Sequence, residues 1–299
     1  MIPNLASLRY QQVLSQNGGP LTRVSCSEIS LLGGRWFEAN AYLRPEHTAG
    51  LWHRQVFGSA SGSGTDRSPL VARFKAISEA MERWAHWATF RSPEASRYGF
   101  DVDPSSNGMA AFPGLFARQA RAAAFREATE RFNLLNWWEG RLSATAVEAP
   151  WPDADAFVIE SDLPGVTVIL HRRSERGHHA FGHASRPTFG AACEAAAVEM
   201  ERHEAAVGYY VLAGCGRGHE ADTDMHPIEQ RSIFFSSEEG YEAFREHVAC
   251  RLVGARPKPR VIFDGAVPGP WARYAHVWRV LFEPPSLRFL SHEPEYFLW

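Results

Sequence analysis

The sequence predicts a mixed α/β fold in which largely antiparallel sheets pack with helices. Three long segments rich in alanine and charged residues have the composition of helices. Other segments alternate apolar with polar residues or gather β-branched residues, as strands do. Two of these strands, 156–160 and 166–171, flank the turn sequence Leu-Pro-Gly at residues 163–165. We therefore expect this pair to form a β-hairpin, whose strands run antiparallel.

The remaining elements follow from the same patterns. In the segment 69–90, Phe74, Ile77, Met81 and Trp84 recur at intervals of three and four residues, which predicts a helix with one apolar stripe. Helices are predicted over residues 5–14, 69–90, 115–138, 188–212 and 238–253, and strands over 21–26, 37–43, 156–160, 166–171 and 260–264. Turns or loops are predicted at 17–20, 33–34 and 91–112, where Gly, Pro, Ser and Asn gather.

Composition excludes several classes of protein. Of the 299 residues, 45% are hydrophobic and 22% charged, as in a soluble globular protein, and the net charge of −3 argues against nucleic-acid binding over the whole surface. There is no apolar run of about 20 residues to cross a membrane, and no signal-peptide pattern at the N-terminus. The four cysteines form no CxxC pair, which predicts neither a disulfide framework nor a structural zinc site and favours the cytoplasm. Tryptophans 137, 138 and 271 are expected in the core or in groove walls.

Two stretches of the form Glu-Ala-x-Glu-Arg-aromatic stand out. On a helix, residues three apart share a face, so Glu79 and Glu82 point the same way, as do Glu127 and Glu130. Two adjacent acids repel each other by a few tenths of a kcal/mol, roughly. A divalent cation is one reason to retain them, and four carboxylates near arginines suit Mg²⁺ with nucleotide phosphates. The other interpretation is a solvated helix face. The two stretches are not part of a sustained repeat.

The stretch 58–68, the richest in Gly and Ser, also has two interpretations. It is either a flexible surface loop or a cradle of backbone N–H groups that leads into the N-terminus of the following helix, where phosphate binding is favoured.

Several of these segments resemble the YcaO family. Residues 61–83 join Ser-Gly-Ser-Gly to a helix ending in Glu-x-x-Glu-Arg, and they are similar to the family's first ATP-site segment. Residues 119–138 look like the second segment, and 182–202, which open on a Gly-x-x-x-x-Pro turn, look like the family's later helix. Residues 277–284 fit its closing strand. The resemblance keeps the family's order and spans most of the chain.

The resemblance implies a YcaO-like ATP-binding fold that forms a single domain over residues 1–299, without a separate leader-peptide-binding domain. It also implies a reaction. A nucleophile attacks a backbone amide carbonyl of a peptide, the oxyanion attacks the γ-phosphate of ATP, and loss of phosphate leaves an azoline, a thioamide or an amidine. The implied cofactors are ATP and Mg²⁺, because phosphoryl transfer depends on neutralising and positioning charge. The implied partners are a ribosomally made precursor peptide, a separate leader-binding protein and, as a family expectation, a second copy of the chain.

The resemblance assigns ten residues to the site, five of them to catalysis. By match to the motifs these are the magnesium ligands Glu79, Glu82, Glu127 and Glu130, the phosphate contact Arg131, and the nucleotide-site residues Ser78, Arg83, Gln119, Glu199 and Arg202.

Departures from the family pattern support a second hypothesis. Ser63 stands where the family often has Lys, Gln119 where it has Glu, and Ala195 where it has Arg, while Arg202 replaces Gln and restores a positive charge. The C-terminus lacks the Pro-x-Pro-x-Pro tail of azoline-forming members. The alternative to an enzyme is therefore a catalytically degenerate YcaO-like subunit that binds or scaffolds a peptide-modifying complex.

Two further groups of residues have a chemical and a plain interpretation. One group is four clustered histidines, which are either metal ligands or part of a solvated loop: His171, His178, His179 and His183. Their spacing matches no metal pattern, which favours the loop. Cys215 near His219 is either a nucleophile or an ordinary thiol.

Overall fold

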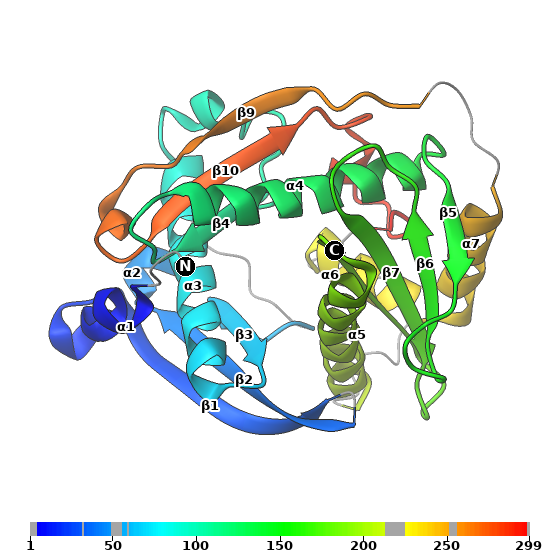
Figure 1. Ribbon diagram of the computed structural model, residues 1–299, viewed down its shortest axis with the longest axis horizontal. Helices are drawn as coiled ribbons and strands as arrows, with labels where there is room; N and C mark the ends of the chain where they lie inside the picture. Colours follow the sequence, from blue (N-terminus) through cyan, green and yellow to red (C-terminus); the bar gives the residue numbers. More distant parts are fainter. Residues whose placement is uncertain are drawn as a thin grey trace. The chain divides into compact units, whose positions relative to one another are not determined.

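The structure of the chain is a computed structural model, and it describes residues 5–31, 33–48, 56–58, 60–212, 225–250 and 256–297 (Figure 1). The chain folds as two compact units. Unit 1 comprises Met1–Leu51, Ser59–Ala128 and Arg260–Glu283, and unit 2 comprises Trp52–Gly58, Thr129–Pro259 and Pro284–Trp299. Both units combine antiparallel strands with helices, so the predicted mixed α/β class is confirmed.

Unit 1 holds two antiparallel sheets among its described residues, with strand orders β1-β2-β3 and β4-β10-β9. The strands are β1 (Leu21–Leu31), β2 (Gly34–Leu43), β3 (Gly62–Asp66), β4 (Met109–Phe112), β9 (Val261–Ala266) and β10 (His276–Phe282). The helices are α1 (Ala6–Arg9), α2 (Pro45–Thr48) and α3 (Pro69–Phe90), with 3-10 turns η1 (Tyr10–Gln12), η2 (Ser15–Asn17), η3 (Ala95–Tyr98) and η4 (Pro270–Arg273).

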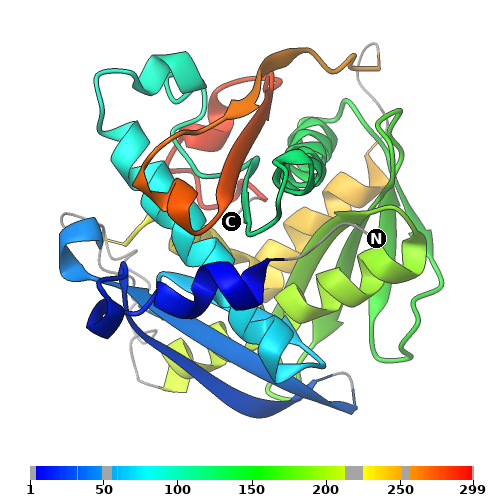
Figure 2. The same cartoon turned by 60° about the vertical axis from the view of Figure 1, so that its left-hand side comes forward.

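Helix α3 lies on the sheet β1-β2-β3, as the cyan helix over the blue strands in Figure 2 shows. It begins where Ser68 accepts a hydrogen bond from the Val71 N–H and Pro69 occupies the first turn, which is a strong start signal. Its alanines face β3 at very short range. A Cβ placed on Gly62 would lie 2.3 Å from the Ala76 carbonyl oxygen, so only glycine allows this approach.

Unit 2 holds one antiparallel sheet among its described residues, in the order β5-β6-β7-β8. The strands are β5 (Ala144–Val147), β6 (Asp155–Ile159), β7 (Val166–Arg173) and β8 (His179–Arg186). The helices are α5 (Phe189–Leu212), α6 (Pro227–Phe235) and α7 (Glu238–Ala249), with the 3-10 turn η5 (Arg288–Leu290). Helix α4 (Arg118–Trp138) begins in unit 1 and continues into unit 2.

Helix α5 packs on β7 and β8 in the same way that α3 packs on its sheet. A Cβ on Gly182 would lie 2.0 Å from the Ala196 carbonyl oxygen. Gly182 and Ala196 each follow their unit 1 counterparts, Gly62 and Ala76, by 120 residues. The cap of α5 is also equivalent, because Thr188 accepts from the Ala191 N–H as Ser68 does from the Val71 N–H. The two units therefore share a strand-to-helix arrangement that the sequence patterns did not reveal.

The two units have separate cores. In unit 1, Met81, Ala85, Met109 and Trp271 are buried between α3 and the strands. In unit 2 an aromatic core forms around Trp137, with rings from several elements in contact at 4.8–5.6 Å between centroids, among them Trp138, Phe181, Phe235, Phe244 and Phe297. The expectation that these tryptophans belong to the core is confirmed. Within the described residues, no helix is long and apolar enough to span a membrane.

The long elements appear close to their predicted positions, whereas short ones differ. The helix predicted over 5–14 is α-helical only at α1, and β4 forms at the end of the segment predicted as a loop. Helix α6 was not predicted. The stretch 58–68 is not a flexible loop, because its centre is strand β3, paired with β2 from Phe37↔Asp66 to Ala41↔Gly62. Gly62 and Gly64 allow the close contact with α3.

The histidine cluster is not a solvated loop, so this part of the prediction is wrong. His171 and His179 are buried on adjacent strands, with His171 Nε2 2.9 Å from His179 Nδ1. Asp155 contacts His171 at 3.0 Å and Glu238 contacts His179 at 3.2 Å. The two polar rings can be buried because their nitrogens have hydrogen-bond partners. Each ring contacts the other ring with one nitrogen and a carboxylate with the other nitrogen. Cys215 and His219 lie outside the described residues.

A buried histidine makes the stability of the fold sensitive to acid. His203 on α5 accepts at Nδ1 from the Phe181 N–H and donates from Nε2 to the Ser232 carbonyl, so the ring is neutral. Burial lowers its pKa from 6.5 to about 4. As the pH falls, the unfolded chain therefore binds a proton at this histidine before the folded chain does. The stabilisation is present above pH 6.5 and is lost as the pH falls through about 4. The expected loss is about 3 kcal/mol of unfolding free energy.

Urea unfolding at several pH values between 7.5 and 4 measures this loss. His203→Gln, which keeps a donor and an acceptor, is expected to give a shallower decline with falling pH. The exposed His292→Gln is the control for removing a histidine. Parallel curves for wild type and His203→Gln would contradict the prediction.

Candidate functional site

Helix α3 carries the first predicted glutamate pair, and strand β3 fixes one of its members. The Glu79 Oε2 atom accepts from the Ser63 N–H at 2.9 Å and from its hydroxyl at 3.4 Å. The Oε1 atom accepts from Arg83 at 3.4 Å. The strand therefore holds the Glu79 carboxylate at the position of Ser63, where the family often has lysine.

Glu82, one turn along α3, has no such anchor. Its carboxylate makes no hydrogen bond or ion pair with any residue that the structure describes, although the side chain is partly buried. Burial raises its pKa well above the ordinary value, and the negative charges of Glu127 and Glu79 raise it further, against the opposing charge of Arg83. An unanchored carboxylate beside two other acids is costly for folding alone.

Arg83 is the cation of this group. Burial lowers its pKa, but the charges of Glu79, Glu82 and Glu127 together outweigh burial and leave the pKa raised. The structure thus brings Glu79, Glu82, Arg83 and Glu127 together within unit 1. The group therefore combines three carboxylates with one arginine.

Two other predicted residues of unit 1 have structural contacts. The Ser78 hydroxyl is 2.7 Å from the Tyr10 hydroxyl and so connects α3 to η1. Gln119 packs on Gly114, where a Cβ would lie 2.1 Å from the glutamine Oε1. That oxygen is buried and has no hydrogen-bond donor among the described residues.

In unit 2, strand β8 fixes Glu130 through both carboxylate oxygens. His183 donates from Nδ1 to Oε1 at 2.8 Å, and the Ser185 N–H donates to Oε2 at 2.9 Å. On the next residue of α4, the Arg131 guanidinium lies over the Phe289 ring, 4.9 Å from its centroid. Burial first, and then the charge of Arg131, lower the pKa of Arg231 to about 10. Arg131 therefore lies close to a second guanidinium.

The predicted residues on α5 pair with each other. Arg202 contacts Glu199 at 3.1 Å, three residues apart on one helix face, and Glu199 is half exposed. An exposed pair at this spacing contributes about 0.3–0.5 kcal/mol to the helix. Ala195, where the family has arginine, precedes Glu199 by one turn on the same helix.

Three acidic side chains of unit 1, those of Glu79, Glu82 and Glu127, influence one another electrostatically. Among the residues in the described ranges, no group of three or more His, Cys, Asp or Glu side chains is arranged to hold a metal ion. Mg²⁺ keeps several waters and binds through one or two carboxylates together with phosphates. The Glu82 carboxylate makes no hydrogen bond or ion pair with the described residues, and it experiences the charges of Glu127 and Glu79.

Three contacting residues were absent from the sequence prediction. The sequence patterns place Ser63 in the Gly/Ser-rich stretch and as a departure from the family's lysine, and they place His183 and Ser185 in a turn segment and His183 in a histidine cluster. Their positions in the two glycine-containing stretches before α3 and α5 are the signal that could have identified them. The carboxylates that they bind are distant in sequence, and only the folded sheets reveal those pairs.

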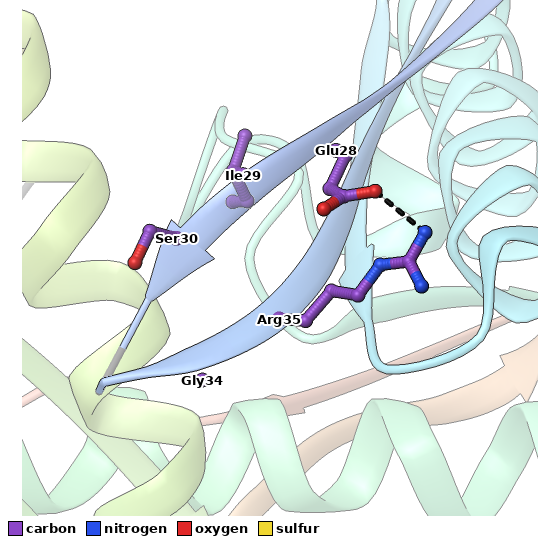
Figure 3. A pocket seen from close by; sticks show the side chains of 5 residues that line it. All are labelled: Glu28, Ile29, Ser30, Gly34 and Arg35. Carbon is purple, nitrogen blue, oxygen red and sulfur yellow. Dashed lines mark hydrogen bonds and ion pairs between the residues drawn. The ribbon is translucent and has the colours of Figure 1, made fainter.

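One surface hollow lies elsewhere in unit 1, at the end of the β1–β2 hairpin (Figure 3). Glu28, Ile29, Ser30, Gly34 and Arg35 line it, and Arg35 pairs with Glu28 at 2.7 Å. None of the predicted site residues lines this hollow. Its two charged side chains, Glu28 and Arg35, form an ion pair with each other.

Solved structures share this fold. A chain of the E. coli microcin synthetase McbBCD complex with pro-MccB17 bound matches with a TM-score of 0.56 and 12% identity, over 88% of this chain and 87% of that chain. YcaO from Methanopyrus kandleri, bound with AMPPCP and Mg²⁺, matches with a TM-score of 0.54 and 14% identity, over 98% of this chain and 92% of that chain. No protein-family model and no curated protein sequence matches the chain.

These matches define the class of fold. The chain has the fold of the YcaO proteins, an α/β fold of antiparallel sheets packed with helices, as its sequence predicted. At this level of identity the likeness concerns the fold.

Proposed function

We propose that the protein is an ATP- and Mg²⁺-dependent enzyme that activates a backbone amide of a peptide. The observation that carries this proposal is the Glu82 carboxylate, which has no anchor and lies beside Glu127 and Glu79 with a raised pKa. Carboxylates kept together at a cost to folding are typical of functional sites. The YcaO structure that shares the fold is bound with AMPPCP and Mg²⁺, which supports the same pair of ligands here.

In this proposal Glu79, Glu82, Glu127 and Glu130 hold Mg²⁺, which neutralises phosphate charge during transfer. Arg83 supports the unit 1 acids through its ion pair with Glu79. Arg131 contacts phosphate, and its guanidinium keeps its orientation by stacking on Phe289. Ser78, Gln119, Glu199 and Arg202 complete the nucleotide site that the resemblance assigns.

The reaction proceeds through the amide carbonyl. A nucleophile adds to the carbonyl carbon, the resulting oxyanion displaces ADP from the γ-phosphorus, and elimination of phosphate gives an azoline, a thioamide or an amidine. The precursor peptide is the substrate, in the reducing cytoplasm. The McbBCD structure is a complex with pro-MccB17 bound, which supports a peptide substrate and partner proteins for this chain. A separate leader-binding protein and a homodimer are further parts of the proposal.

The scaffold hypothesis rests on a different observation. Gln119 keeps its oxygen buried against Gly114, and Glu199 and Arg202 neutralise each other. A subunit that only binds its partners in a peptide-modifying complex needs none of these groups for phosphate. The unanchored Glu82 favours the enzyme, because a scaffold gains nothing from it.

Calorimetric titration of ADP and ATP, with and without Mg²⁺, separates the two functions. We expect binding that requires Mg²⁺ and is lost in Glu130→Gln. Glu94→Gln, an exposed glutamate paired only with Arg97, is the matched control and is expected to bind as wild type. Absence of binding at millimolar nucleotide by the folded protein would overturn the enzyme and favour the scaffold.

A further inference from the structure

The charged side chain of Glu130 is held by a clamp on strand β8 that no sequence motif assigns to the nucleotide site. Each oxygen receives one hydrogen bond, from the His183 ring and from the Ser185 backbone. The pair is largely enclosed, because the His183 side chain is 14% exposed and that of Glu130 is 18% exposed. A carboxylate only accepts hydrogen bonds, so His183 Nδ1 carries the hydrogen.

The clamp leaves Glu130 able to bind a cation. A carboxylate has about four lone-pair positions, and His183 and Ser185 use one on each oxygen. With both oxygens fixed from the strand side, the side chain loses its rotational freedom before any ligand arrives. Such partners of a metal-binding carboxylate orient it, and their loss typically lowers metal affinity by about 10–100-fold.

A similar clamp occurs in unit 1. Ser63 lies on β3 in the position that corresponds to His183 on β8, 120 residues earlier, and it fixes Glu79 with its N–H and hydroxyl. Both residues directly follow a glycine whose added Cβ would overlap the backbone of the neighbouring helix, Gly62 in unit 1 and Gly182 in unit 2. Because the glycine lets the strand pack directly against the helix backbone, the next residue is held rigidly and can orient a carboxylate.

We propose that His183 is a positioning residue for the magnesium site, which it serves by holding the Glu130 carboxylate in its binding orientation. This inference rests on the proposed function and deepens it. His183 contacts neither the peptide nor the nucleotide in this role. It acts through Glu130 alone, as Ser63 acts through Glu79 in unit 1.

Two substitutions at one position test the role. His183→Phe keeps a ring but removes the donor, and His183→Asn restores a donor close to the position of Nδ1. His178→Asn, a histidine on the β7–β8 turn away from Glu130, is the control. The readouts are the Mg²⁺ concentration that gives half-maximal nucleotide binding, the affinity for Mn²⁺ alone by electron paramagnetic resonance, and the melting temperature.

We expect His183→Phe to need about 10-fold more Mg²⁺ and to bind Mn²⁺ about 10-fold more weakly, with recovery in His183→Asn. A merely structural role predicts instead that both readouts follow the melting temperature. Equal metal dependence in wild type and His183→Phe overturns the inference, and so does failure of His183→Asn to recover at an unchanged melting temperature.

Failure of the proposed function is distinguishable from failure of this inference. If wild type binds neither Mg²⁺–nucleotide nor Mn²⁺, the proposed function fails, and the positioning role fails with it. If wild type binds both and His183→Phe binds equally well, only the positioning role fails. Nitrogen NMR of His183 adds an independent readout, because a proton on Nδ1 is expected in wild type and its signal is expected to shift in Glu130→Gln.

Discussion

Replacing Glu82 with glutamine is expected to abolish Mg²⁺-dependent nucleotide binding and, at the same time, to stabilise the fold. Glutamine keeps the shape of the side chain and removes only the charge. Loss of one metal ligand should weaken Mg²⁺ affinity by at least about 100-fold, since loss of its supporting contacts alone costs about 10–100-fold. The unfolding free energy should rise by about 1 kcal/mol, as removal of strained functional groups commonly does.

The opposite signs of these two effects follow from the contacts of Glu82. The carboxylate gives up no hydrogen bond or ion pair within the described part of the chain, and it is repelled by Glu127 and Glu79. The folded state therefore gains when the charge is removed. A metal ion, in contrast, depends on that charge.

The raised pKa of Glu82 also predicts a pH dependence of metal binding. Mg²⁺ binds the ionised carboxylate, so its affinity should increase as the pH rises through the raised pKa of this group. In Glu82→Gln the residual affinity should lose that dependence.

Calorimetry with Mg²⁺–ATP and urea unfolding of the same preparations measure both effects, with Glu94→Gln as the exposed control. A variant that binds nucleotide as wild type does would remove Glu82 from the site. A variant that is destabilised would show that Glu82 has a structural partner instead.

Replacing Gly182 with alanine is expected to destabilise the protein by about 3 kcal/mol, in the upper range for overpacking. The added Cβ would lie 2.0 Å from the Ala196 carbonyl oxygen and 2.3 Å from the Met200 backbone nitrogen. Both atoms belong to the backbone of α5, so the helix must move away from β8. Relief by a side-chain rotation is impossible.

Gly190→Ala, within α5, is the matched control. No atom lies within 4 Å of the added Cβ there, and alanine favours the helix by about 0.5–1 kcal/mol over glycine. The free energy of unfolding measured in urea should therefore fall for Gly182→Ala and rise for Gly190→Ala. Equal stability of Gly182→Ala and wild type would contradict the close contact between strand and helix.

The altered distance between α5 and β8 has a second consequence under the proposed function. His183 directly follows Gly182, so a displaced strand should also misplace the clamp on Glu130. We expect Gly182→Ala to weaken Mg²⁺-dependent binding even at temperatures where it stays folded.

Local sequence patterns were sufficient to predict the long helices and the hairpin. Helix α3 spans the predicted residues 69–90, because its apolar period, its Ser68 cap and Pro69 are all local signals. The strands β6 and β7 pair through the predicted turn for the same reason. Local patterns also grouped Glu79 with Glu82 and Glu127 with Glu130, since spacing on a helix needs no tertiary information.

The contacts that hold each glutamate depend on the tertiary fold. Ser63 fixes Glu79 and His183 fixes Glu130 from strands whose neighbours are set by sheet register, which local sequence does not encode. The residues 58–68 illustrate the same limit, because glycines that read as a loop are needed for a strand lying against a helix backbone. Glu79 and Glu82 are alike in sequence. They differ because the fold brings a hydrogen-bond donor within reach of Glu79 and none of the described donors within reach of Glu82.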